Sequence, residues 1–597
     1  RIRSLFVAIG VCPQACERQR NMETADGIVI GAGHNGLICA AYLARAGLKM
    51  AVIERNPEIG GGSTTDEVTL PGFRHNLHAN FHFGTVDSPW FRDLELYRYG
   101  FSYILPTVML AMTFMDGTCA TFHQDPKKTA ASIAKISKQD AETFRALYDR
   151  YSVQMRPLIL SLAFSPQLPS DEILNRLKGP EADDLISYGK LSINEAIERT
   201  FEHEKVRNWF RLIIHARTVD FDTPGAGGFF PAIFSGLHRT ALAMGGSLEL
   251  PRSLARIVEE GGGTIVRGKT VKDIVLKSGG AREVVLDDGA RWEARRCIVS
   301  AIDAPQTLDL AGEEAFSENI VKKLRAWRWG EHTLCTIHLA LNEPPRYASS
   351  SFDPDVSRAF NVFMGPETTA EFDENMAELD RGEFPTRPMG NGACNSLVDP
   401  TYAPAGKHVA FWWPYARFEL KGDPANWDGF REEATQRLVE AWRGYAPNLT
   451  EDNILGEYTF TPLDISRRNI NMVRGAVQSG AYDPDQSGIN RPHPELSGYR
   501  TPVKGLYLCG ATTGPGGGPQ RGAGLWGSQC HRGGPQDPPV VEEGPCATMA
   551  FEKEGDQRQG KGLTRGSRPE REGLRKAATA DLPVLGPAAS GNLRARP

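Results

Sequence analysis

The sequence lacks any apolar run long enough to cross a membrane. No stretch approaches the roughly 18 residues that a spanning helix needs, and the longest near the start covers only 5–11. It also lacks an excess of one charge, because 68 basic and 73 acidic side chains give a formal net charge of -5. Binding a polyanion such as a nucleic acid, with its many phosphates, needs a basic excess, so we expect no nucleic-acid partner.

Paired cysteine motifs are absent as well. The 10 cysteines are scattered, and no two CxxC pairs occur. The sequence therefore predicts neither a zinc site nor a disulfide framework. We expect a reducing compartment, the cytoplasm. No Ser-His-Asp order and no CxxC redox pair is present, so the sequence identifies no catalytic residue.

The two ends differ from the rest of the chain. Residues 1–21 precede Met22, and either a short secretory signal or translated upstream sequence could explain them. The second interpretation is favoured because the first strand begins soon after Met22. Residues 531–597 contain 10 Gly and 8 Pro but one aromatic, Phe551. Both ends are predicted to be disordered, because such compositions cannot offset the entropy of ordering.

Hydrophobic residues make up 40% of the chain, enough for sizeable cores. The first organised segment is a βαβ pattern. An apolar strand at 26–30 leads into the glycine-rich turn GAGHNG at 31–36, and an Ala/Leu-rich helix follows at 37–46. A second strand at 49–53 ends at Glu54. This is a GxGxxG turn between a strand and a helix, with an acidic residue about 20 positions on.

Each residue of this motif has a physical role in dinucleotide binding. Gly31 permits the tight turn, Gly33 lets the backbone approach a pyrophosphate, and Gly36 allows close packing of helix on strand. The helix N-terminus offers N–H groups and a partial positive charge to the phosphates. Glu54 would accept a hydrogen bond from a ribose 2′-OH. The alternative is a glycine-rich turn in an unrelated α/β unit.

A second glycine cluster indicates which dinucleotide is bound. Glu54 and Arg55 lead into Gly60-Gly-Gly-Ser-Thr64, and Pro71-Gly-Phe73 lies beyond. The cluster gives a further close backbone approach just after the ribose carboxylate. NAD domains do not need it, so FAD is the predicted cofactor.

At this point the sequence resembles a known family. GAGHNGLICAAYLARAG and ERNPEIGGGSTTDEVTLPGF look like the phytoene desaturase-like branch of the FAD-dependent amine-oxidase superfamily. The likeness is strongest to the branch named for pyridine nucleotide-disulfide oxidoreductase domain-containing protein 2. Residues 399–408 and PELSGYRTPVKGLYLCGATTGPGGG at 494–518 resemble two further motifs, in the family's order. The resemblance covers about 24–524.

The resemblance implies an α/β fold of the GR2-type flavoproteins. A Rossmann-like FAD-binding domain would comprise 24–95, 243–315 and 496–530, and an interleaved α+β substrate domain would comprise 96–242 and 316–495. We expect helices at 140–160, 193–215, 246–261 and 428–445, and strands at 263–266, 271–276, 284–292, 297–300, 334–341, 409–413 and 504–510.

The motifs and the resemblance together imply a set of cofactor-binding residues. They are Gly31, Gly33, His34, Asn35, Gly36, Glu54, Arg55, Gly61, Gly62, Ser63, Val271, Gly510, Gly516, Gly517 and Gly518. In the family, the position of Val271 meets the adenine through its backbone, whereas from the residues alone it is an ordinary strand valine. The position of His34 contacts solvent or cofactor rather than reacting.

The sequence departs from the family after Gly518. The family continues with an Ala-rich helix whose N-terminus points at the flavin, whereas this chain reads PQRGAGLWGSQC and then the Gly/Pro-rich tail. A translated frameshift, a mis-spliced exon and a divergent end are the open explanations. We therefore hypothesise that the chain binds FAD weakly.

Two other segments have more than one interpretation. His75, His78 and His82 could bind a metal, lie beside the flavin or serve packing; no local carboxylate or Cys completes a ligand set, so no metal is predicted. The apolar run 229–234 could line a substrate channel, dock on a membrane or form buried core, which is the favoured interpretation.

The predicted function is an FAD-dependent oxidoreductase that abstracts hydride from an apolar substrate to flavin N5, as desaturases do. An amine oxidase and a low-turnover interaction protein derived from a flavoprotein are the alternatives. Oxygen and a quinone are the open choices for the electron acceptor, and peripheral membrane contact is a further expectation. Substrate identity and oligomeric state are not indicated.

Overall fold

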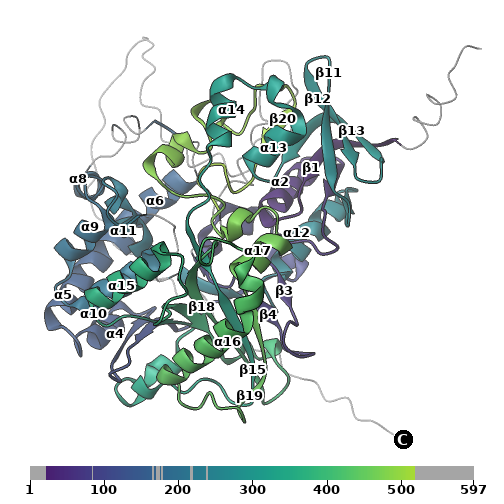
Figure 1. The fold of residues 1–597 in the computed structure, drawn as a ribbon. Coiled ribbons are helices and arrows are strands. Elements are labelled where there is room, and N and C mark those ends of the chain that lie inside the picture. The colour runs from purple at the N-terminus through teal and green to yellow at the C-terminus, as the bar shows by residue number, and fades with distance from the viewer. Residues whose placement is uncertain are drawn as a thin grey trace, which may run out of the picture. The chain divides into compact units, whose positions relative to one another are not determined.

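The computed structural model describes residues 22–517 apart from gaps at 84, 165–166, 170–171, 173–174, 176–178, 216–219 and 237–238. The predictions for 1–21, for Gly518 and for all later residues, including the divergent end, lie outside the described residues. Two large sheets organise the described part of the chain (Figure 1). In that part, no helix has the length and apolarity needed to cross a membrane.

The first sheet carries the glycine-rich turn. Its parallel strands lie in the order β10-β2-β1-β13-β20, and the hairpin β11–β12 continues the sheet in antiparallel fashion beside β13. The strands are β1 (Met22–Ile30), β2 (Met50–Ile53), β10 (Thr264–Val266), β11 (Val271–Lys277), β12 (Gly280–Leu286), β13 (Arg291–Ser300) and β20 (Leu506–Leu508). The predicted strand 297–300 is thus the end of the longer β13, whose first residues pair with β12 and last residues with β20.

Alternation along β1 sorts its side chains between two cores, because successive strand residues point to opposite faces. Ile28 and Ile30 pack with residues of the β11–β12 hairpin. Val29 packs on the other face against helices α2 (His34–Arg45) and α12 (Glu249–Glu260). A parallel sheet covered by helices after a glycine-rich turn confirms the predicted Rossmann-like α/β fold.

A glycine ends helix α2, and this glycine is a local signal in the sequence. Gly47 takes a positive φ of 86°. Its N–H bonds to the Ala44 carbonyl at 2.9 Å, and the Leu48 N–H bonds to the Leu43 carbonyl at 3.1 Å. This is the Schellman arrangement, in which glycine lets the chain turn back toward β2.

The second sheet has the order β19-β15-β18-β17-β16-β7-β8, with β14 beside β18. Its strands are β7 (Val108–Thr113), β8 (Cys119–His123), β14 (His332–Leu334), β15 (Thr336–Leu341), β16 (Asn361–Met364), β17 (Gly390–Ala393), β18 (His408–Arg417) and β19 (Ile454–Phe460). Helix α16 (Asn426–Tyr445) packs Leu438 and Trp442 into a core with Trp412 of β18. The neighbouring β18 residues Phe411 and Trp413 belong to a different core.

Smaller elements lie between the strands of the two sheets along the chain. They are the strands β3 (Thr65–Asp66), β4 (His75–Asn76), β5 (His82–Phe83), β6 (Tyr103–Ile104) and β9 (Thr240–Ala243), and the helices α3 (Pro89–Asp93), α13 (Ala304–Ala311), α14 (Glu318–Arg325), α15 (Thr369–Asp380) and α17 (Pro462–Arg468). The predicted boundaries of the two domains stay a prediction.

A helical region lies beside the second sheet (Figure 1). It comprises α4 (Pro126–Ile133), α5 (Lys138–Leu147), the π-helical turn η4 (Tyr148–Met155), α6 (Arg156–Ala163), α8 (Pro180–Tyr188), α9 (Ile193–Thr200), α10 (Glu204–His215) and α11 (Phe229–Phe234). The segment 140–160 is helical throughout, as predicted, but the π-helical turn η4 separates α5 from α6. Pro157, which has no N–H to continue the α-helical bonds, marks the change to α6.

The single helix predicted at 193–215 is also two helices. Phe201 takes an extended backbone at the end of α9. The carboxylate of Asp140 then accepts the backbone N–H groups of Glu202 at 2.8 Å and His203 at 3.0 Å. This remote side chain satisfies donors that a continuous helix would have used, so α10 starts anew at Glu204.

The strand predicted at 334–341 is interrupted at Cys335. Both parts pair with β18, but Pro414 of β18 stands opposite the break. Proline has no N–H for the ladder, so the two parts are separate strands.

Candidate functional site

The glycine-rich turn joins β1 to α2. Gly31 has a φ of 96°, a left-handed conformation that favours glycine. A Cβ on Gly36 would lie 2.3 Å from the Gly31 carbonyl oxygen and 2.8 Å from Ala301 Cβ. No side chain caps α2 at Gly33. The turn therefore brings the N-terminus of α2 close to the sheet, with its N–H groups and partial positive charge available to an anion.

The second glycine cluster packs against this turn. The Gly60 N–H bonds to the Ala32 carbonyl at 2.9 Å, and Gly33 and Gly60 form a parallel bridge. A Cβ on Gly61 would lie 3.1 Å from Gly33 Cα. Two stretches of bare backbone thus meet at one wall, as the close approach of a pyrophosphate requires.

Glu54 lies at the end of β2 and is 6% exposed. Its two carboxylate oxygens accept the backbone N–H groups of Ala32 and Asn56, both at 2.9 Å. Burial raises the pKa of this carboxyl, and the two N–H groups partly oppose that effect. A carboxylate has about four acceptor positions, so Glu54 can hold the glycine turn and still accept a ribose hydroxyl.

These elements border a cleft of about 300 Å³. Ten of the predicted binding residues line it: Gly31, Gly33, His34, Asn35, Glu54, Arg55, Gly61, Gly62, Val271 and Gly517. Their contacts with a cofactor stay a prediction. The buried Oδ1 of Asn35 has no hydrogen-bond partner among the described residues, so a ligand donor could satisfy it.

Four predicted residues do not line the cleft. Gly36 and Ser63 are packed behind it. A Cβ on Gly510 would lie 2.4 Å from the Ile302 carbonyl oxygen, and a Cβ on Gly516 would overlap the Tyr482 hydroxyl. These glycines allow close packing of the segment that follows β20.

Sequence reasoning missed part of the cleft. Gln306 and Asp309 of α13 line it, together with residues 469–472, Val477 and Ser479 from the loops after α17. No motif marks these loops. Their conformation depends on buried Arg491, which donates to the carbonyl groups of neighbouring segments, including Ser479 at 3.2 Å and Ala511 at 3.2 Å.

The cleft suits a dinucleotide. It runs from an uncapped helix N-terminus, past bare glycine backbone, to a carboxylate that can accept a ribose hydroxyl and to the start of β11. At Gly33 a Cβ would meet only Gly61 Cα, at 4.0 Å, so the described residues leave that part of the cleft open to a ligand. These residues therefore fit FAD.

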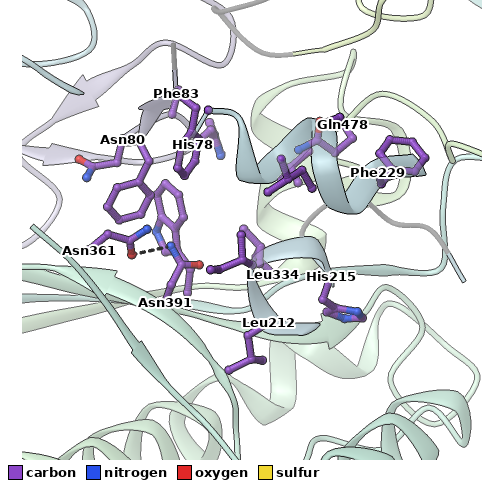
Figure 2. Close-up of a pocket in the computed structure, with 18 of the residues that line it drawn as sticks. His78, Asn80, Phe83, Leu212, His215, Phe229, Leu334, Asn361, Asn391 and Gln478 are labelled. Atoms are coloured by element: carbon purple, nitrogen blue, oxygen red, sulfur yellow. Dashed lines mark hydrogen bonds between the residues drawn. The ribbon is translucent and has the colours of Figure 1, made fainter. Parts of the chain in front are cut away.

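A second cavity, of about 410 Å³, adjoins the cleft. The two share four lining residues, His34, Gly62, Met472 and Val477. Most of the rest of the wall comes from β14, β16, β17 and β18 of the second sheet, from α6, α10 and α11, and from residues 78–81 and Phe83. Figure 2 shows several of these side chains. Most of these side chains are apolar, among them Leu212, Phe229, Ile233, Leu334, Phe363 and Trp413.

The charges along this cavity are few. Among its described lining residues there is no Asp or Glu. Arg156 forms an ion pair with Asp87 and donates to the Ser235 carbonyl at 2.9 Å. Burial lowers the pKa of His78 to about 3 and holds the pKa of His215 well below its usual value. At neutral pH both imidazoles are neutral, so the cavity has no unpaired formal charge among these groups.

The three neighbouring histidines have different surroundings. His75 bonds to Thr69 Oγ1 at 2.8 Å, and His82 bonds to the Tyr103 hydroxyl at 2.9 Å. Of the three, His78 alone lines the cavity. The described residues contain no group of three His, Cys, Asp or Glu side chains that could hold a metal ion.

The apolar run 229–234 forms α11, which contributes both to the core and to the cavity wall. Phe230 and Phe234 are buried in the core of the helical region. Phe229 and Ile233 line the cavity. Membrane docking of this segment stays a prediction.

Comparison with known proteins agrees with this geometry. A family model described as an NAD(P)-binding Rossmann-like domain matches residues 29–98. One of the limonene dehydrogenase subunits of Castellaniella defragrans is 29% identical, with 83% of this chain and 92% of that protein covered. Pyridine nucleotide-disulfide oxidoreductase domain-containing protein 2 of Rattus norvegicus is 27% identical, with 84% and 92% covered.

More distant matches extend the comparison. The neurosporene-forming phytoene desaturase of Rhodobacter capsulatus is 24% identical, with 82% of this chain and 90% of that protein covered. A solved structure of putrescine oxidase shares the fold at a TM-score of 0.55, with 16% identity and 85% and 98% of the two chains covered. The chain is therefore an FAD-dependent oxidoreductase, homologous to these dehydrogenase and desaturase proteins, and its Rossmann-like domain fits the FAD-dependent amine-oxidase superfamily.

Proposed function

We propose that the protein is a dehydrogenase or desaturase that abstracts hydride from an apolar substrate held in the 410 Å³ cavity. The observation that carries this proposal is the wall shared by cleft and cavity, formed by His34, Gly62, Met472 and Val477. A cofactor in the cleft would present one end to the cavity there. When bound, FAD supplies a hydride acceptor at its N5 atom.

The chain's own residues position the substrate and exclude water. Leu212 and Phe363 come from α10 and β16, and Phe229 and Ile233 come from α11. Apolar walls on opposite sides can fix the orientation of a C–H bond, which is the main protein contribution to hydride transfer. The catalytic residue, if the reaction needs a base, stays unassigned.

Charge distinguishes this function from amine oxidation. Amines reach a binding site mainly as cations, and burying a cation without a partner is costly. The described lining offers aromatic rings such as Trp413 and Tyr415 but no carboxylate to pair with a substrate ammonium. The one arginine of the wall, Arg156, is already paired with Asp87. The cavity therefore favours a neutral, apolar substrate.

The relatives' names also support an apolar substrate. Limonene and phytoene, named in two of them, are isoprenoid hydrocarbons. Oxygen and a quinone remain the candidate electron acceptors. Cytoplasmic location and peripheral membrane contact belong to the same proposal, because an apolar substrate partitions into lipid; cell fractionation tests both.

The test is anaerobic reduction of the bound flavin, followed by its visible absorbance. Isoprenoids should bleach the flavin bands of the purified protein, whereas putrescine should not. Ile233→Trp should abolish bleaching by filling the cavity while the flavin spectrum persists, and Ile233→Val is the matched control. Bleaching by amines alone would favour the amine oxidase, and a purified protein without flavin bands would favour the interaction protein.

A further inference from the structure

One histidine of the cavity wall differs from the others. His332 of β14 lines the cavity, and its side chain is 16% exposed. Its Nε2 atom lies 3.2 Å from Oδ1 of Asp380. Its Nδ1 atom forms no hydrogen bond with the described part of the chain and, unlike the ring nitrogens of His78 and His215, is not shut off from solvent. The ring thus has one nitrogen in use and one that a ligand can reach.

The surroundings of the ring put this nitrogen on the cavity side. His332 and Leu334 project from the same face of β14, because side chains two residues apart on a strand share a face. Leu334 and His215 line the cavity in Figure 2, and the ring of His332 lies 5.2 Å from that of His215. Asp380, by contrast, is 65% exposed and does not belong to the cavity wall. The bond to Asp380 therefore holds Nε2 on the solvent side and leaves Nδ1 toward the cavity.

The carboxylate of Asp380 also decides which nitrogen carries the proton. A carboxylate only accepts hydrogen bonds, so Nε2 must be the donor of this pair. Burial lowers the pKa of His332, although Asp380 opposes that effect, so the ring is neutral at neutral pH. A neutral imidazole with its proton on Nε2 has a lone pair on Nδ1. His332 therefore presents an acceptor, and not a donor, to the cavity.

Several other polar groups of the wall are already bonded. The Tyr415 hydroxyl donates to the Leu212 carbonyl at 2.9 Å, and Arg156 is paired with Asp87. A hydrocarbon that fills the cavity would remove water from Nδ1 of His332 without replacing its hydrogen bond, which costs free energy. A ligand hydroxyl would replace that bond. A ligand carbonyl would not, because it has no hydrogen to donate.

We propose that Nδ1 of His332 accepts a hydrogen bond from a hydroxyl group on an otherwise apolar substrate. The substrate class is then an alcohol, such as a terpenoid or lipid alcohol, rather than a hydrocarbon or a ketone. This rests on the proposed function only in taking the cavity as the substrate site. His332 is a specificity-determining residue, and no chemical step is assigned to it.

The test uses limonene, carveol and carvone, which share one carbon skeleton and carry no oxygen, a hydroxyl and a carbonyl, respectively. Their dissociation constants are measured on the purified full-length protein from quenching of tryptophan fluorescence, since Trp413 lines the cavity. Carveol should bind about tenfold more tightly than limonene, the worth of a hydrogen bond in a dry site. Carvone should bind like limonene, because it cannot donate to Nδ1.

Two variants of one residue locate the effect. His332→Phe keeps a ring of similar size but has no acceptor, so it should lower the affinity for carveol to about that for limonene and leave the other two ligands unchanged. His332→Gln can donate its amide N–H to Asp380 and keep its oxygen as an acceptor, so it should retain part of the preference for carveol. Phe83→Leu, a change of the cavity wall without a polar group, should affect all three ligands alike.

Equal affinity of carveol and limonene for the unaltered protein would overturn the proposal. Carvone that binds as tightly as carveol would also overturn it, because a donor of the wall would then recognise the oxygen. A preference for carveol that survives in His332→Phe would assign the acceptor to another residue. Flavin reduction is scored separately: carveol-selective binding without flavin reduction would refute only the proposed function, and reduction without this selectivity would refute only the role of His332.

Discussion

Gly33 and Gly36 lie three residues apart in one motif, yet a side chain would meet different surroundings at each. At Gly36, a Cβ would lie 2.3 Å from a carbonyl oxygen and 2.8 Å from another Cβ. At Gly33, it would approach only Gly61 Cα at 4.0 Å, with a backbone conformation that any residue can adopt. Folding therefore requires glycine at 36, whereas at 33 the predicted requirement comes from a ligand.

This difference predicts opposite effects of two alanine substitutions. Gly36→Ala should lower the free energy of unfolding by about 1–3 kcal/mol through overpacking. Gly33→Ala should leave the thermal midpoint of the flavin-free protein unchanged but weaken FAD binding by about tenfold or more, because the methyl group occupies the pyrophosphate approach. Thermal melts and FAD titration of both variants measure this. Unchanged FAD affinity in Gly33→Ala would contradict the pyrophosphate assignment.

At the same scale, sequence reasoning located the part of the cleft whose pattern is local. Gly31, Gly33, Glu54, Gly61 and Gly62 line it, and spacing within one βαβ unit marks each of them, whereas their contacts with a cofactor stay a prediction. Residues 469–472 and Val477 could not be predicted, because their place in the cleft depends on loops held by Arg491.

At the scale of elements, α13 joins the cleft to the first sheet. It begins just after β13, and Asp303 caps it by accepting the Gln306 N–H at 2.8 Å. Asp303 is 1% exposed. Burial raises the pKa of its carboxyl to about 7, although hydrogen bonds from Gln306 oppose this. The cap is therefore a carboxyl that the fold holds more easily in its neutral form.

The sign of the pH effect follows. The Asp303 carboxyl has a pKa of about 7 in the folded chain and about 3.9 in the unfolded chain. Its contribution to the free energy of unfolding is therefore fully present below pH ~4 and is lost as the pH rises toward 7. Asn is an equally good cap without the charge. The free energy of unfolding of Asp303→Asn, relative to that of wild type, should thus increase by about 2–3 kcal/mol from pH 5 to pH 8.

Denaturant unfolding of both proteins at the two pH values measures this. Asp125, the exposed cap of α4, gives the matched control, because Asp125→Asn removes a charge that folding does not bury. A constant difference between Asp303→Asn and wild type at both pH values would contradict the burial argument.

Element boundaries show where sequence patterns end. The helix at 34–45 was predicted nearly to its last residue because its cap, Gly47, is local. The helix at 193–215 was not, because Asp140 from another helix caps the start of α10. Likewise Pro414 interrupts the strand across from it, at Cys335. Both errors arise from contacts between segments that no periodicity within one segment reports.

At the scale of the whole molecule, four separated segments build the cofactor cleft. They are 30–62, 269–310, 469–479 and 511–517. The parts of the chain between them form the second sheet and the helical region. A ligand that contacts all four segments binds the folded chain and not the unfolded one. Cofactor binding is therefore coupled to stability across the described part of the molecule.

This coupling predicts a large thermal shift on adding FAD to the flavin-free protein. At 100 to 1,000 times the dissociation constant, binding should stabilise the fold by about 3–4 kcal/mol. FMN lacks the adenosine half that Glu54 and Val271 would hold, so it should give a much smaller shift at the same concentration. Gly33→Ala should melt like the unliganded wild type and respond weakly to FAD. Equal shifts with FMN and FAD would show that the cleft beside Glu54 does not hold the adenosine half.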